Sequence, residues 1–155
     1  MQIIGFNFTK VSAERFMDFQ GQPVINTDME FLDLEREKLD ILRDTEGIKA
    51  TFRYSVIHEE KPQEKEEKKI KEEKESKGKK QGQVIFEGHI ILSASKDEAK
   101  NIFKSWKKKE LPNSLRLPLF NLILRKCSPR AVQLEDEINL PLHLPFPQIK
   151  PQNQE

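Results

Sequence analysis

The chain has 155 residues, with 27 Lys plus Arg against 26 Asp plus Glu and a formal net charge of +1. This length allows a single domain with one modest core. The balanced charge excludes the strongly basic footprint that is typical of proteins binding nucleic acid or anionic membranes. Charged residues make up 34% of the chain, a fraction that favours a thermophilic source.

The compartment is indicated by a few residues. Cys127 is the one cysteine, so no internal disulfide is possible and a reducing cytoplasm is favoured. The N-terminus, MQIIGFNFTK, lacks the basic and apolar regions of a signal peptide. The longest apolar run is too short to span a bilayer. We therefore expect a soluble cytoplasmic protein with no membrane insertion.

Four segments have the alternation of apolar and polar residues that is typical of β-strands. The fourth has apolar residues on both faces, with Val84 and Phe86 on one and Ile85 and Ile91 on the other. Two apolar faces indicate a central strand, or a strand whose second face meets a partner chain. The four predicted strands span residues 2–11, 24–34, 48–57 and 83–93.

A charged run separates the third and fourth predicted strands. Residues 59–80 include nine Lys, eight Glu and a single strongly apolar residue, Ile70. Such a composition cannot bury enough apolar surface to fold. We expect a disordered charged loop at about 59–82.

The pattern then changes to a helical period. Ser95 and Glu98 form the capping-box spacing S-x-x-E, and an apolar stripe that includes Ile102 and Trp106 follows. A second helix is predicted from Asn113 or Ser114. Its broad apolar face is predicted to consist of Leu115, Leu119, Phe120, Ile123, Leu124 and Cys127.

The C-terminal part of the chain leaves alternatives open. Ser128-Pro129 resembles an N-cap followed by a proline in the first helical position, so a third helical segment can begin at Pro129. Residues 139–155 then form a Pro-rich tail. The predicted fold is α+β: one domain over 1–155, with a four-stranded antiparallel sheet (a meander) and two or three C-terminal helices packed on one face.

No pattern in the sequence predicts a catalytic, cofactor or metal site. His89 and Glu87 share one strand face, but a metal would need two more ligands from elsewhere. Cys127 lies on the apolar stripe, which predicts an inert core thiol. The consecutive carboxylates of residues 135–137 point in different directions on a helix and do not form a catalytic pair.

A lysine cluster offers a second function class. Lys104 and residues 107–109 flank Trp106, and cations beside an aromatic ring can bind single-stranded nucleic acid. The alternative, which we favour, is a helix C-terminus with snorkelling lysines and a core tryptophan.

The tail carries the remaining apolar residues, which alternate with prolines and cannot form a central strand. They either fold back over the sheet or meet another polypeptide in a hydrophobic groove. The candidate partner surface consists of Leu140, Leu142, Leu144 and Phe146.

The order of elements resembles the SecB-type export chaperones and their archaeal relatives. The similar segments are VINTDMEFLDL, IKATFRYSV, QVIFEGHIIL, the helix pair ELPNSLRLPLFNLILRKCSPRAV and the tail NLPLHLPFP. The resemblance implies a non-enzymatic chaperone, active in protein export, that forms a dimer or tetramer and holds unfolded polypeptides in a hydrophobic groove. Two features depart from the family: the charged run and a net charge near zero, where the bacterial chaperones are strongly acidic.

Overall fold

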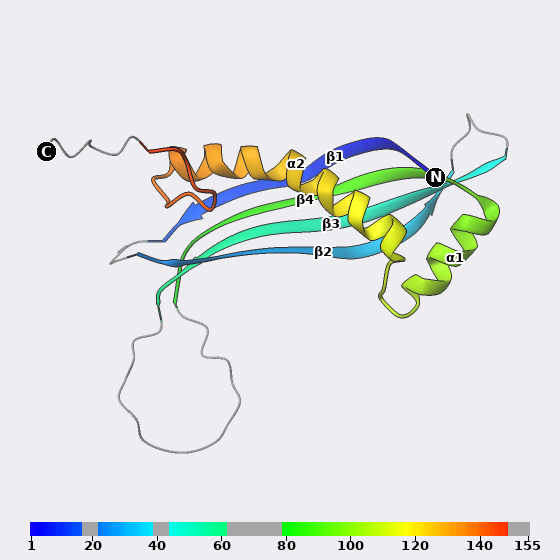
Figure 1. Cartoon of the computed structure of the whole chain (residues 1–155), viewed down its shortest axis with the longest axis horizontal. Coiled ribbons are helices and arrows are strands. Elements are labelled where there is room, and N and C mark those ends of the chain that lie inside the picture. Colours follow the sequence, from blue (N-terminus) through cyan, green and yellow to red (C-terminus); the bar gives the residue numbers. More distant parts are fainter. Residues whose placement is uncertain (17–21, 39–43, 62–78, 149–155) are drawn as a thin grey trace, which may run out of the picture.

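Four long antiparallel strands form the sheet of this protein. The computed structural model describes residues 1–16, 22–38, 44–61 and 79–148. The strands are β1 (Gln2–Arg15), β2 (Val24–Glu37), β3 (Thr45–Glu59) and β4 (Lys80–Ser95), in the spatial order β1-β4-β3-β2 (Figure 1). Strands β2, β3 and β4 form a meander, and β1 pairs with the free side of β4. The edges of the sheet are therefore β1 and β2.

The central place of β4 follows from its two apolar faces. Gly88 lies opposite Phe8 of β1 and Phe52 of β3. A Cβ atom at Gly88 would lie 2.9 Å from the Phe52 ring and would also collide with the backbone carbonyl of Asn7. Glycine thus lets the Phe52 ring of β3 and the backbone of β1 approach this point of the sheet closely.

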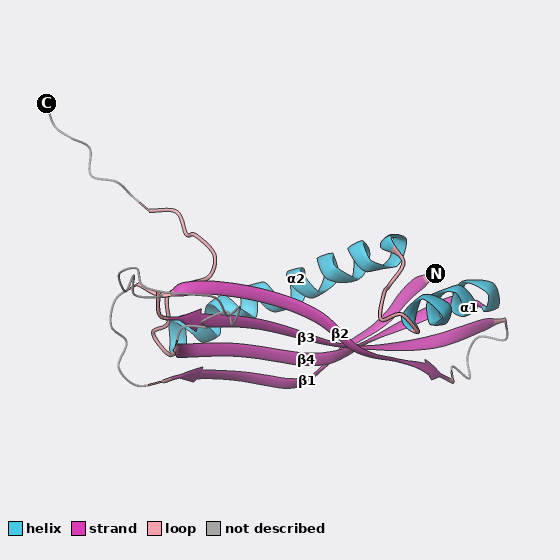
Figure 2. Ribbon diagram, turned by 90° about the horizontal axis from the view of Figure 1, so that it is seen from below, coloured by secondary structure: helices cyan, strands magenta, loops and turns pink. Residues whose placement is uncertain are grey.

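Two helices follow the strands, α1 (Lys96–Trp106) and α2 (Asn113–Glu137). Both contact β3 and β4, and α2 runs along the sheet while α1 lies at one end (Figures 1 and 2). The buried side of β3 alternates from Ile48 through Phe52 to His58. It packs against a strict i, i+4 series on α2: Leu115, Leu119, Ile123, Cys127, Ala131 and Glu135. The predicted α+β class and helical layer are confirmed.

Several boundaries differ from the predictions. Pro129 lies inside α2 and does not start a third helix. The buried stripe of α2 is narrower than predicted, because Leu124 is exposed and Phe120 is half-buried. Strand pairing extends to Glu59 and from Lys80, so both ends of the charged run belong to strands. Its central part, residues 62–78, lies outside the described residues.

The capping of α1 is as the sequence predicts. Ser95 Oγ accepts from the Glu98 backbone N–H at 3.3 Å, and a Glu98 carboxylate oxygen accepts from the Ser95 N–H at 2.9 Å. Hydrogen bonding to Ser95 lowers the pKa of Glu98 below its ordinary value, because it favours the ionised carboxylate. Neither described helix is long and apolar enough to cross a membrane.

Candidate functional site

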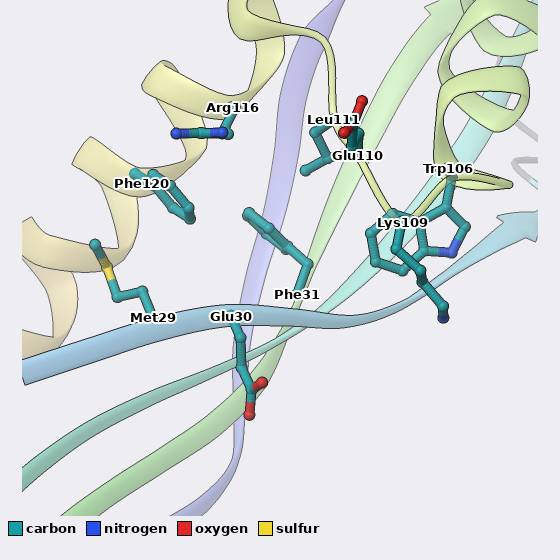
Figure 3. A pocket seen from close by; sticks show the side chains of 9 residues that line it. All are labelled: Met29, Glu30, Phe31, Trp106, Lys109, Glu110, Leu111, Arg116 and Phe120. Atoms are coloured by element: carbon teal, nitrogen blue, oxygen red, sulfur yellow. The ribbon is translucent and has the colours of Figure 1, made fainter. Parts of the chain in front are cut away.

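A pocket of about 430 Å³ opens beside the edge strand β2. Its walls come from β2, from the α1–α2 connection and from the first half of α2 (Figure 3). These three segments are distant in sequence and meet only because α2 crosses back over the sheet. The pocket is lined by Met29, Glu30, Phe31, Trp106, Lys109, Glu110, Leu111, Arg116 and Phe120. We call this pocket the β2 groove.

Aromatic rings form much of the β2 groove. Phe31 and Phe120 stack with ring centroids 5.5 Å apart and planes 10° apart. The Lys109 ammonium lies 4.7 Å from the centroid of the Trp106 ring, and the Arg116 guanidinium lies 5.6 Å from that of Phe120. Rings with cations over their faces give a surface that is apolar and still tolerates water. Such a surface suits apolar and aromatic side chains of varied shape.

Charges of both signs surround the apolar centre of the groove. Glu30 points to the opposite side of β2 (Figure 3), where its carboxylate pairs with Arg53 at 3.2 Å. Lys109, Glu110 and Arg116 remain at the rim. A rim of mixed charge favours no single charge on a ligand, and the chemistry of the groove is that of apolar contact.

The backbone of β2 beside the groove lies at an edge of the sheet. One side of β2 pairs with β3, and no described strand pairs with the other side. Two β2 amides already have side-chain acceptors: the Met29 N–H donates to Asp28 Oδ1 at 2.9 Å and the Leu34 N–H donates to Asp33 Oδ1 at 2.8 Å. An unpaired strand edge is a template on which an extended peptide can add as a further strand. The register shift between Phe31 and Asp33 lies beside the groove and bends the edge at this point.

The tail residues predicted as a partner surface are divided by the structure. Leu140 is buried and Leu142 is half-buried, whereas Leu144 is 43% exposed and Phe146 is 58% exposed. The first two fold back on the body of the protein. The segment that contains the last two follows the end of α2 that lies away from α1 (Figure 1), whereas the groove is lined by the α1–α2 connection and the first half of α2. Their role as a partner surface stays a prediction.

The other residues considered from the sequence have structural partners. His89 Nδ1 lies 3.1 Å from Thr51 Oγ1, and Glu87 binds Arg53 at 2.8 Å on the outer face of the sheet. Among the described residues, no group of three or more His, Cys, Asp or Glu side chains is arranged to hold a metal ion. Burial raises the pKa of the Cys127 thiol to about 12, so the thiolate that a nucleophile needs is not formed at neutral pH.

The lysine cluster and its tryptophan are also engaged within the chain. Trp106 is half-buried at the end of α1, and Lys109 adopts a left-handed backbone conformation with φ of 59°. This turn brings the Lys109 ammonium over the Trp106 ring. The aromatic ring therefore lines the β2 groove and does not lie on an open basic face.

A buried polar cluster at the far end of α2 was missed from the sequence. Glu135 is fully buried and accepts from the His143 backbone N–H at 3.1 Å, and His143 Nδ1 lies 2.9 Å from both carboxylate oxygens. His143 Nε2 lies 3.3 Å from the Tyr54 hydroxyl, which is 3.1 Å from Ser128 Oγ. His58 Nε2 lies 3.8 Å from Glu135 Oε1.

Residue spacing gave two signals for this cluster. Glu135 continues the i, i+4 stripe of α2, and His58 continues the inward alternation of β3.

The cluster is closed to substrates. The side chains of Glu135 and His58 are 0% exposed and that of His143 is 3% exposed, and the contacts of the cluster join the tail to β3 and α2. No family model, curated protein sequence or solved structure matches the chain.

Proposed function

We propose that this protein is a non-enzymatic binding protein of the chaperone type, which holds extended segments of non-native polypeptides in the β2 groove. The observation that supports this most strongly is an aromatic groove directly beside an edge strand, β2, whose outer side pairs with no other described strand. An unfolded segment can pair its backbone with β2 and place apolar side chains in the groove, against the stacked Phe31–Phe120 pair and beside Trp106. Backbone pairing is independent of sequence, as binding of many different clients requires.

The resemblance to SecB-type chaperones agrees with this proposal, and it rests on the order of elements. It also suggests a homo-oligomer, a dimer or tetramer working in the cytoplasm. Large apolar side chains remain exposed away from the groove, at the other edge of the sheet and on α2. These include Ile3 at 39%, Ile4 at 45% and Leu117 at 61%. Association of copies through Ile3 and Ile4 of β1, at the edge of the sheet opposite β2, would leave the β2 groove open. Light scattering at several concentrations measures the assembly.

A nucleic-acid accessory role is the alternative from the sequence. The structure adds no observation in its favour, since Trp106 lines the groove and Lys109 covers its ring.

The proposal is tested by two matched substitutions on the same strand. Met29 lines the groove, whereas Val24 is 39% exposed on the same edge strand outside it. Met29→Glu places a carboxylate where client side chains bind, and desolvating it weakens binding by at least about tenfold. Val24→Glu leaves binding unchanged. The measurement is suppression of aggregation of a chemically unfolded model protein, after both variants are shown to be folded by circular dichroism.

Two results would contradict the proposal. One is a wild-type protein that fails to suppress aggregation at any stoichiometry. The other is an equal loss of suppression in the two variants, which would place client binding elsewhere on the molecule.

A further inference from the structure

The chain leaves α2 by a turn that directs it back over the sheet. Asn139 has a left-handed backbone with φ of 55°. The Leu140 N–H donates to the Glu135 carbonyl at 2.8 Å, and the Asn139 N–H donates to the Asp136 carbonyl at 3.2 Å. These two bonds form a Schellman motif, which ends the helix and fixes the direction of the exit. Arg15 of β1 donates to the Asn139 carbonyl at 3.0 Å and holds the turn from the other side.

Beyond this turn, the attachments of the tail are concentrated in residues 140–143. The Leu140 side chain occupies the space that a Cβ atom on Gly82 would need, with an approach of 2.6 Å. The Pro141 carbonyl accepts from His58 Nε2 at 2.7 Å. His143 binds Glu135 through both its backbone and its ring. Residues 144–148 are exposed.

The described part of the tail, residues 140–148, pairs with no described strand and forms no helix. Detaching it breaks the contacts of residues 140–143 and leaves every pairing of the sheet and the hydrogen bonds within α2 intact. Segments attached in this way open locally, at a lower free energy than global unfolding.

The burial of two polar side chains away from water opposes the closed state. With the tail in place, the Glu135 carboxylate is fully buried and so is His58, whose Nδ1 has no partner among the described residues. Removing a carboxylate from water costs several kcal/mol, which the hydrogen bonds of His143 offset. Opening the tail returns water to both groups. Closure is therefore a balance between the packing of Leu140 and the bonds of His143 on one side and desolvation of Glu135 and His58 on the other.

From this geometry we propose that residues 140–148 are a detachable strap: a segment that opens as a unit while the sheet and α2 stay folded. The Glu135–His143 contact is its anchor. Opening uncovers Tyr54, His58 and Gly82 at this end of the sheet and frees Leu140 and Leu142. The strap is thus a conformational device that changes how much apolar surface this end of the molecule presents. It lies at the opposite end of α2 from the β2 groove (Figure 1), and the inference does not depend on the groove's function.

The wild-type protein tests the proposal by native-state hydrogen exchange at increasing urea below the unfolding transition. The Leu140 and His143 amides donate hydrogen bonds in the closed state, so they report opening. We expect them to exchange through an opening of lower free energy and smaller urea dependence than the amides around Ile123 in α2. The proposal would be overturned if the Leu140 and His143 amides and the amides around Ile123 all exchanged through openings of the same free energy and the same urea dependence.

Two variants identify the anchor. His143→Ala removes the ring contacts with Glu135 and Tyr54. It should abolish protection of the amides at positions 140 and 143, with protection in β3 and α2 retained. Phe146→Ala, at a side chain that is 58% exposed, is the control and should change nothing. If His143→Ala leaves the tail protected, the anchor is wrong. If it unfolds the whole protein, the tail is part of the cooperative core and no detachable strap exists.

Discussion

Tyr54 joins the sheet to the strap. Its ring packs near Phe86, with centroids 6.1 Å apart, and its hydroxyl lies between Ser128 and His143. Burial raises the pKa of Tyr54, and the hydrogen bond with Ser128 acts in the opposite direction. The folded state therefore favours the neutral phenol.

This shift makes the stability of the protein depend on pH at the alkaline end. The contribution of Tyr54 is fully present below the pKa of the unfolded chain, about 10, and is lost as pH rises from there through the higher folded pKa. Tyr54 is the one tyrosine of the chain, so the ultraviolet absorbance of phenolate reports it directly. We expect the folded protein to titrate above the urea-unfolded protein. Coinciding titration curves would show that the hydroxyl is hydrated in solution.

The buried cluster that was not predicted from the sequence contains polar residues at positions where the pattern of a helix or strand indicates burial. Glu135 and His58 each occupy the next buried position of a stripe, and each is stabilised by a tail that is distant in sequence. A pattern predicts that such a position is buried, but it cannot supply the partner. Cys127 was predictable because burial alone determines its behaviour.

At the scale of the elements, α2 contains two prolines. Pro118 lies inside the helix, beyond the first turn in which the sequence placed it, so it also removes a helical hydrogen bond. Pro129 lies in the interior and is exposed. An interior proline removes a hydrogen bond and crowds the preceding turn. The helix nevertheless continues to Glu137, because its buried stripe continues past Pro129 to Ala131 and Glu135. Tertiary packing here outweighs the local signal that predicted a helix start.

Replacing this proline should stabilise the protein. Pro129→Ala relieves a helix penalty of about 3 kcal/mol, offset by roughly 1 kcal/mol from the greater freedom of the unfolded chain. We expect the free energy of unfolding in urea to rise by about 2 kcal/mol. A fall in stability would show that the packing of α2 on the sheet requires the local geometry that Pro129 imposes.

The four strands, the capping box of α1 and the helical layer were predictable because each is determined by local periodicity. The place of β1 beside β4 was not, since pairing depends on competition among strands. The two apolar faces of β4 indicated only that it needs neighbours on both sides. The β2 groove was missed for a similar reason. Its walls come from residues 29–31, 106–111 and 116–120, and no single stretch shows their meeting.

At the scale of the whole molecule, two surfaces of different kinds lie at the two ends of α2. The β2 groove is aromatic and opens beside an unpaired strand edge, whereas the strap end is polar inside and closed by the tail. Between them, the outer face of the sheet carries cross-strand ion pairs such as Arg53–Glu87 and Lys49–Glu35. Both edge strands of the described sheet border a pocket, β2 at the groove and β1 at a smaller one of about 270 Å³ that includes Ile3 and Leu122, and the aromatic rings are at the groove.

Trp106 allows the central claim to be measured directly, because it is the one tryptophan of the chain and lines the β2 groove. A tryptophan-free, extended peptide rich in Leu and Phe is titrated into the wild-type protein while Trp106 fluorescence is recorded. A peptide of equal length made of Ser and Gly is the control. We expect a saturable blue shift with the apolar peptide only, weakened in Met29→Glu and retained in Val24→Glu. Binding of the apolar peptide, measured independently by calorimetry, with no change in Trp106 emission would contradict the account.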